Sequence, residues 1–288
     1  MMSQDCLHAA LISDVDTSGD AAIPALPNPF TVATWNIERG KRLESVLDFV
    51  TRDLAADVLL FQEVDRFARR TGFRDIAFEL AAGTRMQRAF AVEFIELAQG
   101  GDSMPALHGS MTLSRSQLNR PRKITFHNQP HDWGRLKVKI SWVQPRKGGR
   151  MAVIAEFRCG KQTIAIYNTH LESKGSEEGR AEQVSEILRD IKDNYPITTP
   201  IIVAGDLNTG KGILSPVVKL LEGTGFRDVF PPDAAPLTTK PGHRRRLDWI
   251  FVRGLTVLNA SMPLIRVSDH YPVVATLGWP RCTSSAGR

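Results

Sequence analysis

Short apolar runs, each followed by polar side chains, recur along this sequence and restrict the folds open to it. In IIVAGDLN (201–208), four apolar residues lead directly into a glycine, an aspartate and an asparagine. Similar runs, rich in β-branched and aromatic residues, predict further strands. They cover residues 31–37, 58–64, 86–97, 151–157, 163–171, 247–252, 255–262 and 271–279. So many short strands predict a protein built mainly from β-sheet.

Fewer segments show helical spacing. The stretch 175–194 is amphipathic and begins near Ser176, a typical N-cap residue. Shorter helices are predicted near 43–50, 78–82 and 213–225. Because strands outnumber helices and few connections are β–α–β crossovers, the pattern favours two sheets packed together with helices outside.

The chain length sets the number of domains. The 288 residues fit one large domain or two small ones, and no break in composition separates two units. We expect a flexible N-terminal segment (1–29), a single folded domain (30–280) and a flexible tail (281–288). We also expect a monomer.

Cysteine usage and hydropathy bear on the compartment. The three cysteines are far apart and show neither a zinc spacing nor a disulfide framework, which favours a reducing compartment. No apolar run is long enough for a transmembrane segment. The N-terminal residues make a poor secretory signal, because Asp5, Asp14 and Asp16 interrupt their apolar stretch. We therefore expect a cytoplasmic protein.

Six strand ends carry polar side chains that strand pairing does not require. These are Asn36 and Glu38; Gln62, Glu63 and Asp65; Asn168, His170 and Glu172; Asp206 and Asn208; Asp248; and Asp269 and His270. Any one of them alone is more often a turn residue or a hydrogen-bonded core histidine. Six in one chain instead indicate a metal-assisted hydrolase, because Mg²⁺ prefers carboxylate oxygens and an attacking water needs a base.

Six segments occur in one order between residues 31 and 278: TWNIE, FQEVD, NTHLES, GDLNT, RLDWIF and SDHYPV. Together they resemble the endonuclease/exonuclease/phosphatase superfamily, which includes deoxyribonucleases, AP endonucleases, sphingomyelinases, inositol polyphosphate 5-phosphatases and deadenylases. The resemblance implies an α/β fold, a four-layer α/β/β/α sandwich of two packed mixed sheets flanked by helices. It also implies that residues 30–280 form one catalytic domain.

The resemblance implies a metal site. Glu63 would be the principal carboxylate ligand of a Mg²⁺ or Mn²⁺ ion, with Asn36 beside it. Asp269 would reach the same ion or a second metal position.

The resemblance also implies the catalytic residues. Asp206 would orient or deprotonate the attacking water, and Asn208 would hold that water or a phosphate oxygen. His270 would contact the scissile phosphate, with Asp248 fixing its tautomer. His170 would assist the leaving group or the phosphate. Because alternate residues of a strand share a face, Asp206 and Asn208 are expected to point at one phosphate.

Three further residues are predicted to contact the substrate or support the site. Arg115 lies in GSMTLSR, which resembles a phosphate-contacting segment of the family, although Ser110 stands where asparagine is usual. Arg246 follows two other arginines just before Asp248. Glu93 is a candidate carboxylate partner for His170.

Charge and motif details bear on the substrate. Asp65 and Leu247-Asp248-Trp249 depart from the patterns of AP endonucleases and 5-phosphatases, which disfavours those branches. The net charge is +6, and residues 115–150 hold ten basic residues against one acid, with Trp133 and Trp142 among them. Such a stretch suits nucleic acid, and it also suits anionic lipid or an ordinary solvated strand pair.

We therefore predict a metal-dependent phosphodiesterase, a nuclease acting on DNA or RNA. The alternative is a phospholipid (sphingomyelinase-like) or small-phosphoester hydrolase of the same superfamily. A non-catalytic nucleic-acid-binding protein is the third possibility, which the full set of polar strand ends disfavours.

Overall fold

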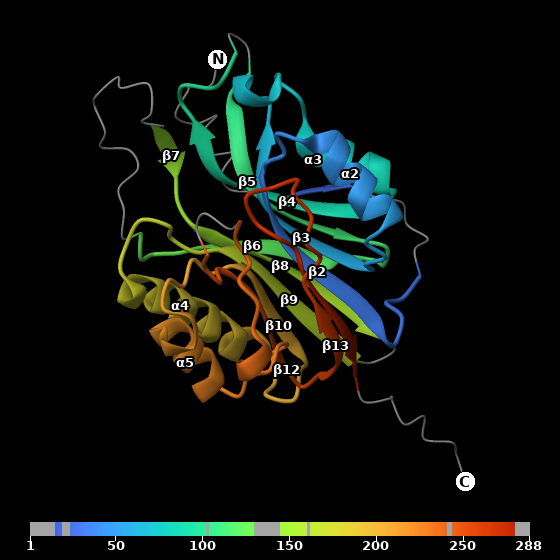
Figure 1. Ribbon diagram of the computed structural model, residues 1–288, viewed down its shortest axis with the longest axis vertical. Helices are drawn as coiled ribbons and strands as arrows, with labels where there is room; N and C mark the ends of the chain where they lie inside the picture. The colour runs from blue at the N-terminus through green and yellow to red at the C-terminus, as the bar shows by residue number, and fades with distance from the viewer. Residues whose placement is uncertain are drawn as a thin grey trace.

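Two β-sheets pack face to face in the computed structural model, and helices lie on both outer sides (Figure 1). The structure describes residues 15–18, 24–101, 104–129, 145–159, 162–240 and 244–279. Helices α2 (Leu43–Arg52) and α3 (Ile76–Thr84) cover the first sheet, and α4 (Glu177–Asn194) and α5 (Pro216–Gly223) cover the second. The predicted four-layer sandwich is confirmed.

The first sheet is mixed, with the strand order β1-β4-β5-β3-β2-β14-β13 and with β7 paired to β4. Its strands are β1 (Val15–Ser18), β2 (Phe30–Arg39), β3 (Val58–Arg66), β4 (Gln87–Glu96), β5 (Ala106–Ser114), β7 (Arg146–Gly148), β13 (Thr256–Ser261) and β14 (Val273–Gly278). Strands β2 and β3 run parallel, and the other described pairs are antiparallel. Strand β14, which comes late in the chain, pairs with β2 and so completes the sheet that the N-terminal strands begin.

The second sheet is also mixed, with the order β11-β12-β10-β9-β8-β6. Its strands are β6 (Asn119–Thr125), β8 (Met151–Cys159), β9 (Gln162–His170), β10 (Ile201–Asp206), β11 (Arg227–Asp228) and β12 (Asp248–Arg253). Strands β9 and β10 are its parallel pair. Each sheet therefore has one parallel pair in its interior.

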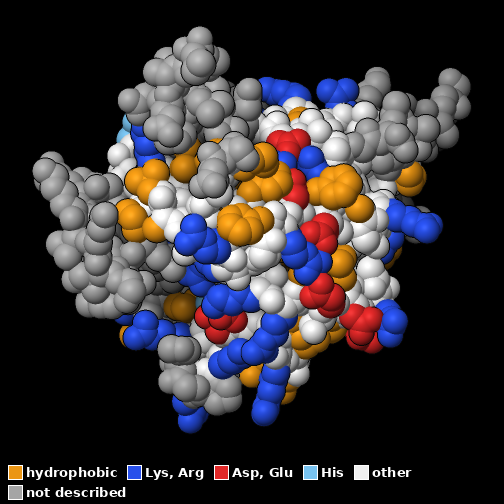
Figure 2. Space-filling model, turned by 90° about the horizontal axis from the view of Figure 1, so that it is seen from above, with side chains coloured by type: hydrophobic (Ala, Val, Ile, Leu, Met, Phe, Trp, Pro, Cys, Tyr) orange, Lys and Arg blue, Asp and Glu red, His pale blue; other side chains and the backbone are white. Residues whose placement is uncertain are grey.

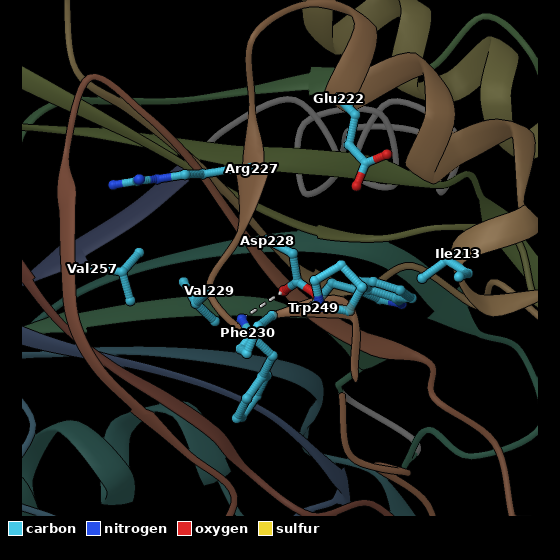
Figure 3. Close-up of a pocket in the computed structure, with 10 residues that line it drawn as sticks. Ile213, Glu222, Arg227, Asp228, Val229, Phe230, Trp249 and Val257 are labelled. Atoms are coloured by element: carbon cyan, nitrogen blue, oxygen red, sulfur yellow. Dashed lines mark hydrogen bonds between the residues drawn. The ribbon is translucent and has the colours of Figure 1, made fainter. Parts of the chain in front are cut away.

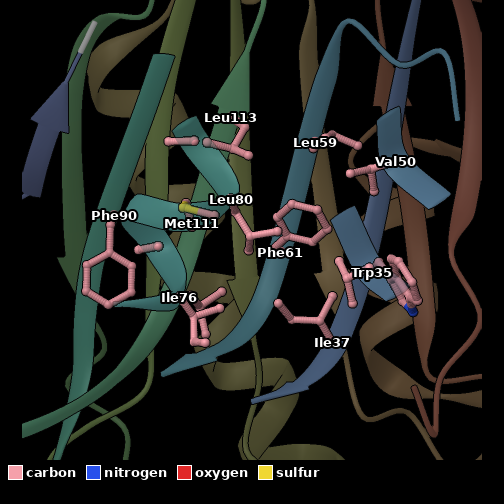
Figure 4. Packing of buried hydrophobic residues seen from close by; sticks show 14 of the residues in the cluster. Trp35, Ile37, Val50, Leu59, Phe61, Ile76, Leu80, Phe90, Met111 and Leu113 are labelled. Atoms are coloured by element: carbon pink, nitrogen blue, oxygen red, sulfur yellow. The ribbon is translucent and has the colours of Figure 1, made fainter. Parts of the chain in front are cut away.

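Alternation along the strands separates the apolar layers. In β2, Trp35 and Ile37 pack toward α2 and α3, whereas Phe30 and Val32 pack toward the second sheet. Figure 4 shows the first of these layers. This is the period of two expected of a strand buried on both faces.

The helix predictions are confirmed in outline. Ser176 is the N-cap of α4, and its side chain accepts a hydrogen bond from the Gly179 N–H at 3.0 Å. Helix α5 starts at Pro216 rather than near 213, because Ser215 caps it and proline suits a first helical position. No helix in the described part of the chain is long and apolar enough to cross a membrane.

One boundary differs from the sequence prediction. Residues 1–29 were expected to be flexible, but Val15–Ser18 pairs with β4 as strand β1, and Leu26 is buried. Backbone pairing and ion pairs from Asp16 to Arg66 and Arg88 hold β1 at the sheet edge. The predicted tail (281–288) lies outside the described residues.

Candidate active site

The carboxyl ends of the two parallel pairs meet at one edge of the sandwich. Asn36 at the end of β2 lies opposite Gln62 in β3, and Glu63 follows directly. In the second sheet His170 and Asp206 end β9 and β10 opposite each other. Asn36 Nδ2 donates a hydrogen bond to Asp206 Oδ2 at 3.1 Å. This bond joins the ends of the two sheets into one site.

Irregular backbone presents Glu63 at this edge. The pairing of β3 with β5 shifts register between Phe61 and Val64, and Glu63 has a φ of +53°. Such a bulge re-aims a side chain, and a positive φ outside glycine is uncommon. Glu63 is half-buried, unlike the fully buried residues on either side of it.

Asp206 is the centre of the site. Its Oδ2 lies 3.5 Å from His170 Nε2 and 3.8 Å from His270 Nε2, in addition to the bond from Asn36. Burial raises the pKa of Asp206 to about 7, with attraction to His270 opposing this rise and repulsion from Asp248 adding to it. A carboxyl group with this pKa can gain or lose a proton near neutral pH.

His270 and Asp248 form a tight pair beside Asp206. Asp248 begins β12 next to Asp206 in β10, and His270 lies just before β14. His270 Nδ1 donates to Asp248 Oδ2 at 2.7 Å, and the other Asp248 oxygen is buried with no hydrogen-bond partner among the residues that the structure describes. Burial alone would lower the pKa of His270, but Asp248 and Asp206 outweigh burial and raise it to about 10. His270 is therefore a cation aimed at the site.

Glu63 has the properties of a ligand for a hard cation. Burial alone would raise its pKa, but attraction to Arg39, with further contributions from the nearby histidines, outweighs burial and holds the pKa well below its usual range. Its carboxylate lies 3.5 Å from Arg39, and Asn36 Oδ1 is on the adjacent strand. An ionised carboxylate beside an amide oxygen fits Mg²⁺ or Mn²⁺.

A model of the Endonuclease/Exonuclease/phosphatase family matches residues 33–270, the span that carries every one of these side chains. The chain belongs to this family. The family match and the cluster of Asp206, Asp248 and His270, whose ligand atoms lie within 4.8 Å of one another, agree with a phosphoesterase site.

Curated relatives of this chain carry the name UPF0294. A UPF0294 protein of Vibrio vulnificus is 28% identical over 166 residues, which are 56% of this chain and 52% of that protein. This chain spans about half the length of the first curated relatives it matches.

Solved structures share the fold. A family member from Beutenbergia cavernae matches with a TM-score of 0.66 at 20% identity, over 88% of this chain and 72% of its own. The human nocturnin catalytic domain with bound sulfate anion matches with a TM-score of 0.62 at 19% identity, over 92% and 97%. At these identities the likeness concerns the fold alone.

Within this family site, His170 lacks the partner that the sequence suggested. Glu93 was the candidate, but its carboxylate pairs with Arg150 Nη1 at 2.8 Å, and His170 Nδ1 is buried with no partner in the described part of the chain. Burial and the nearby charge of Arg150 hold the pKa of His170 well below its usual value. The Glu93 prediction is wrong, because the buried Arg150 binds this carboxylate.

Asn208 is near Asp206, but not on the same strand face. Strand β10 ends at Asp206, and Asn208 has a φ of +50°. Its backbone N–H donates to Asp206 Oδ1 at 3.0 Å, and its Nδ2 donates to Leu171 O at 3.0 Å. The turn therefore replaces the extended geometry that the sequence argument assumed. Of the Asn208 side-chain atoms, Oδ1 is the one left to contact a ligand.

Arg115 lies at the wrong end of the first sheet. Strand β5 runs antiparallel to β3, so Ser114 pairs with Val58, whereas Gly109 pairs with Val64 beside Glu63. The Arg115 side chain donates to Ala56 O at 3.2 Å. The prediction that Arg115 contacts phosphate is wrong, because the segment reaches the site with its first residues and not its last.

Arg246 is buried and bound to another acidic residue. Its guanidinium pairs with Asp228 and lies over the Trp249 ring, 3.6 Å from the ring centroid. Figure 3 shows Asp228, Phe230 and Trp249 lining a pocket at the edge of the second sheet. Arg246 therefore holds this edge together, and the prediction that it binds substrate phosphate is wrong.

Ser268, which the sequence analysis did not single out, connects the Asp269 loop to the site. The Ser268 hydroxyl donates to Asn36 O at 2.7 Å and lies 3.2 Å from Asp269 Oδ1, so it ties this loop to the end of β2. Asp269 is half-buried beside His270. Its place as a metal ligand stays a prediction.

The basic stretch does not form a free cationic surface where the structure describes it. Arg120 pairs with Glu156, Arg122 with Asp190, Arg146 with Glu96 and Arg150 with Glu93. Trp133, Trp142 and the basic residues between them lie outside the described residues. On the one face of the molecule that Figure 2 shows, Lys and Arg side chains lie among acidic and apolar ones.

Proposed function

We propose that this protein is a Mg²⁺- or Mn²⁺-dependent phosphodiesterase that hydrolyses nucleic acid. The observation that supports it best is the convergence on Asp206 of Asn36, His170 and His270. A carboxyl group that titrates near neutrality, next to a cationic imidazole, suits attack of water on a phosphodiester.

The residues divide this task. Asp206 accepts a proton from the attacking water. Burial and repulsion from Asp248 raise the pKa of its carboxyl group, which favours this transfer. His270 donates from Nε2 to a phosphate oxygen, with Asp248 holding its ring. Glu63 and Asn36 would hold the divalent cation, which when bound stabilises negative charge on the phosphate.

Exposed cations near the site favour a polyanionic substrate. Arg244 and Arg245 precede Asp248, Arg266 precedes His270, and Lys211 follows Asn208, and all four are exposed. Backbone contacts from Thr239 to Arg245 and from Lys240 to Asp269 hold these loops against the site. Such side chains neutralise backbone phosphates on either side of a cleaved bond.

The test is hydrolysis by purified protein with Mg²⁺, Mn²⁺ or EDTA. The substrates are plasmid DNA, single-stranded DNA, RNA, sphingomyelin vesicles and a small phosphodiester. We expect metal-dependent cleavage of nucleic acid that Asp206→Asn and His270→Ala abolish, whereas His127→Ala, which changes an exposed histidine, behaves as wild type. Cleavage of lipid or small esters alone would reject nucleic acid as the substrate and retain the chemistry.

A second readout tests the cation separately. Mg²⁺ should raise the unfolding temperature of the wild type, because an ion that binds only the folded state stabilises it. Glu63→Gln should reduce that increase.

A further inference from the structure

A second histidine–aspartate pair lies on the other side of Glu63 from His270. His108 in β5 lies opposite Asp65 in β3, and His108 Nδ1 donates to Asp65 Oδ1 at 2.7 Å. The distance equals that between His270 Nδ1 and Asp248 Oδ2. Both members are buried, with 1% of the His108 side chain and none of the Asp65 side chain exposed.

Arginine holds the Asp65 carboxylate in place. Arg70 donates from Nε to Asp65 Oδ2 at 2.6 Å and from Nη2 to Oδ1 at 2.8 Å. Arg70 also pairs with Glu96, which pairs with Arg146. A carboxylate fixed in this way orients the imidazole and keeps a hydrogen on Nδ1. In the imidazolium form Nε2 also carries a hydrogen and can donate it to a phosphate oxygen. The atom left to contact a ligand is Nε2.

The strand order places this imidazole at the candidate active site. Strand β5 is next to β3, which carries Glu63, whereas His270 lies on the other side, beyond β2. His108 lies opposite Asp65, two residues after Glu63 in β3, so it is on the neighbouring strand and two positions along from Glu63. The charge of His108 acts on both Glu63 and His170, which agrees with this placement.

A core histidine with a purely structural role would use both of its ring nitrogens or face apolar groups. Buried polar atoms are nearly always hydrogen-bonded. Phe94 stacks on the His108 ring, with centroids 6.4 Å apart, and Asp65 binds Nδ1. Among the described residues, the hydrogen-bond contacts of the His108 ring both involve Nδ1, and none involves Nε2. This nitrogen is free to contact a ligand.

We propose that His108 is a third substrate-contacting histidine, whose Nε2 binds a phosphate oxygen on the side of Glu63 away from His270. The proposal rests on the proposed phosphodiesterase function and extends it. The substrate phosphate would then lie between two imidazoles, each fixed through Nδ1 by an aspartate.

Two variants separate the Asp65 contact from the phosphate contact. His108→Asn keeps a donor near the Nδ1 position and has no atom at Nε2. His108→Gln reaches the Nε2 position with its amide. We expect His108→Asn to weaken binding of inorganic phosphate, measured by calorimetry with Mg²⁺, by about 10- to 100-fold. kcat/KM should fall to a similar extent, and His108→Gln should recover part of both.

The matched control is His127→Asn, because His127 is exposed and pairs through its backbone. Phosphate affinity and kcat/KM of folded His108→Asn within twofold of wild type would overturn the proposal. If His108→Asn does not fold, ¹⁵N-histidine spectra of the wild type replace it. The His108 Nε2 resonance should then shift on phosphate addition, and an unchanged resonance at saturation would reject the contact.

Failure of the proposed function gives a different result. A wild type that hydrolyses no substrate but binds phosphate through His108 would reject the phosphodiesterase and keep this contact. Hydrolysis that is unaffected in His108→Asn would reject the contact and keep the phosphodiesterase.

Discussion

The two histidine–aspartate pairs share a 2.7 Å bond and differ in what surrounds the aspartate. Both oxygens of Asp65 are bound by Arg70, so this pair is electrostatically complete within the protein. One oxygen of Asp248 has no partner, and the neighbouring Asp206 carboxyl lies close enough for its pKa to rise to about 7. We call Asp65–His108 the closed pair, because Arg70 binds both of its aspartate oxygens, and Asp248–His270 the open pair, because one aspartate oxygen has no partner among the described residues.

This difference assigns the pairs to different tasks. Unbalanced negative charge in a buried site is unfavourable unless a proton, a cation or a ligand compensates it. The open pair therefore belongs where protons are transferred. The closed pair holds its imidazole in one orientation whether or not a ligand is present. The following predictions test this contrast.

The largest expected effect is on catalysis at the open pair. Asp248→Asn should lower kcat by about 10³- to 10⁴-fold, because an amide no longer fixes the His270 tautomer or favours its charged form. Steady-state kinetics on the cleaved substrate measures this. Asp233→Asn, at an exposed aspartate, is the control. A loss below tenfold would mean that the open pair is not the catalytic one.

The next effect is on stability at the closed pair. Asp65→Asn should lower the free energy of unfolding by about 3–5 kcal/mol, because it leaves the charge of Arg70 without its main partner. Asp248→Asn should lower it less, since the substitution also removes repulsion toward Asp206. Urea unfolding in EDTA compares the two variants. Equal losses would contradict the distinction between the pairs.

The smallest effect is a difference in pH dependence. The folded pKa of His270 is about 10 against an ordinary value of 6.5, so its stabilisation is complete below pH 6.5 and is lost as the pH rises toward 10. The slope approaches about 1.4 kcal/mol per pH unit between these values. Asp65 acts oppositely. Burial would raise its pKa, but bonds from Arg70 and His108 outweigh burial and lower it, so its stabilisation is lost in acid.

Urea unfolding between pH 3 and pH 10.5 separates the two contributions. His270→Asn should flatten the alkaline side of the wild-type curve, and Asp65→Asn should flatten the acidic side. If His270→Asn instead flattened the acidic side and Asp65→Asn the alkaline side, the raised pKa of His270 and the lowered pKa of Asp65 would both be refuted.

Local sequence identified the parts of the site that follow strands. Asn36, Glu63, His170, Asp206, Asp248 and His270 were predicted because a buried run that ends in a polar residue is visible within a few positions. Arg115 failed because the direction of β5 relative to β3 is not visible in the sequence. Arg246 failed because its partner Asp228 lies 18 residues away.

His108 was missed for a related reason. It lies outside the six segments that carry the family resemblance, and its partner Asp65 is 43 positions earlier. Asp65 itself was visible at a strand end, but nothing nearby indicated that it would meet an imidazole. Pairing between strands decides such contacts, and a single sequence carries little information about which strands pair.

The pairing of β14 with β2 has a consequence for synthesis of the protein. The hydrogen bond from Asn36 to Asp206 spans 170 positions, and β14 takes its place beside β2 only after most of the chain exists. During translation, the nascent chain holds Asn36 and Glu63 long before it holds His270. The candidate site therefore cannot be complete until the C-terminal part of the chain has been made and β14 has paired with β2.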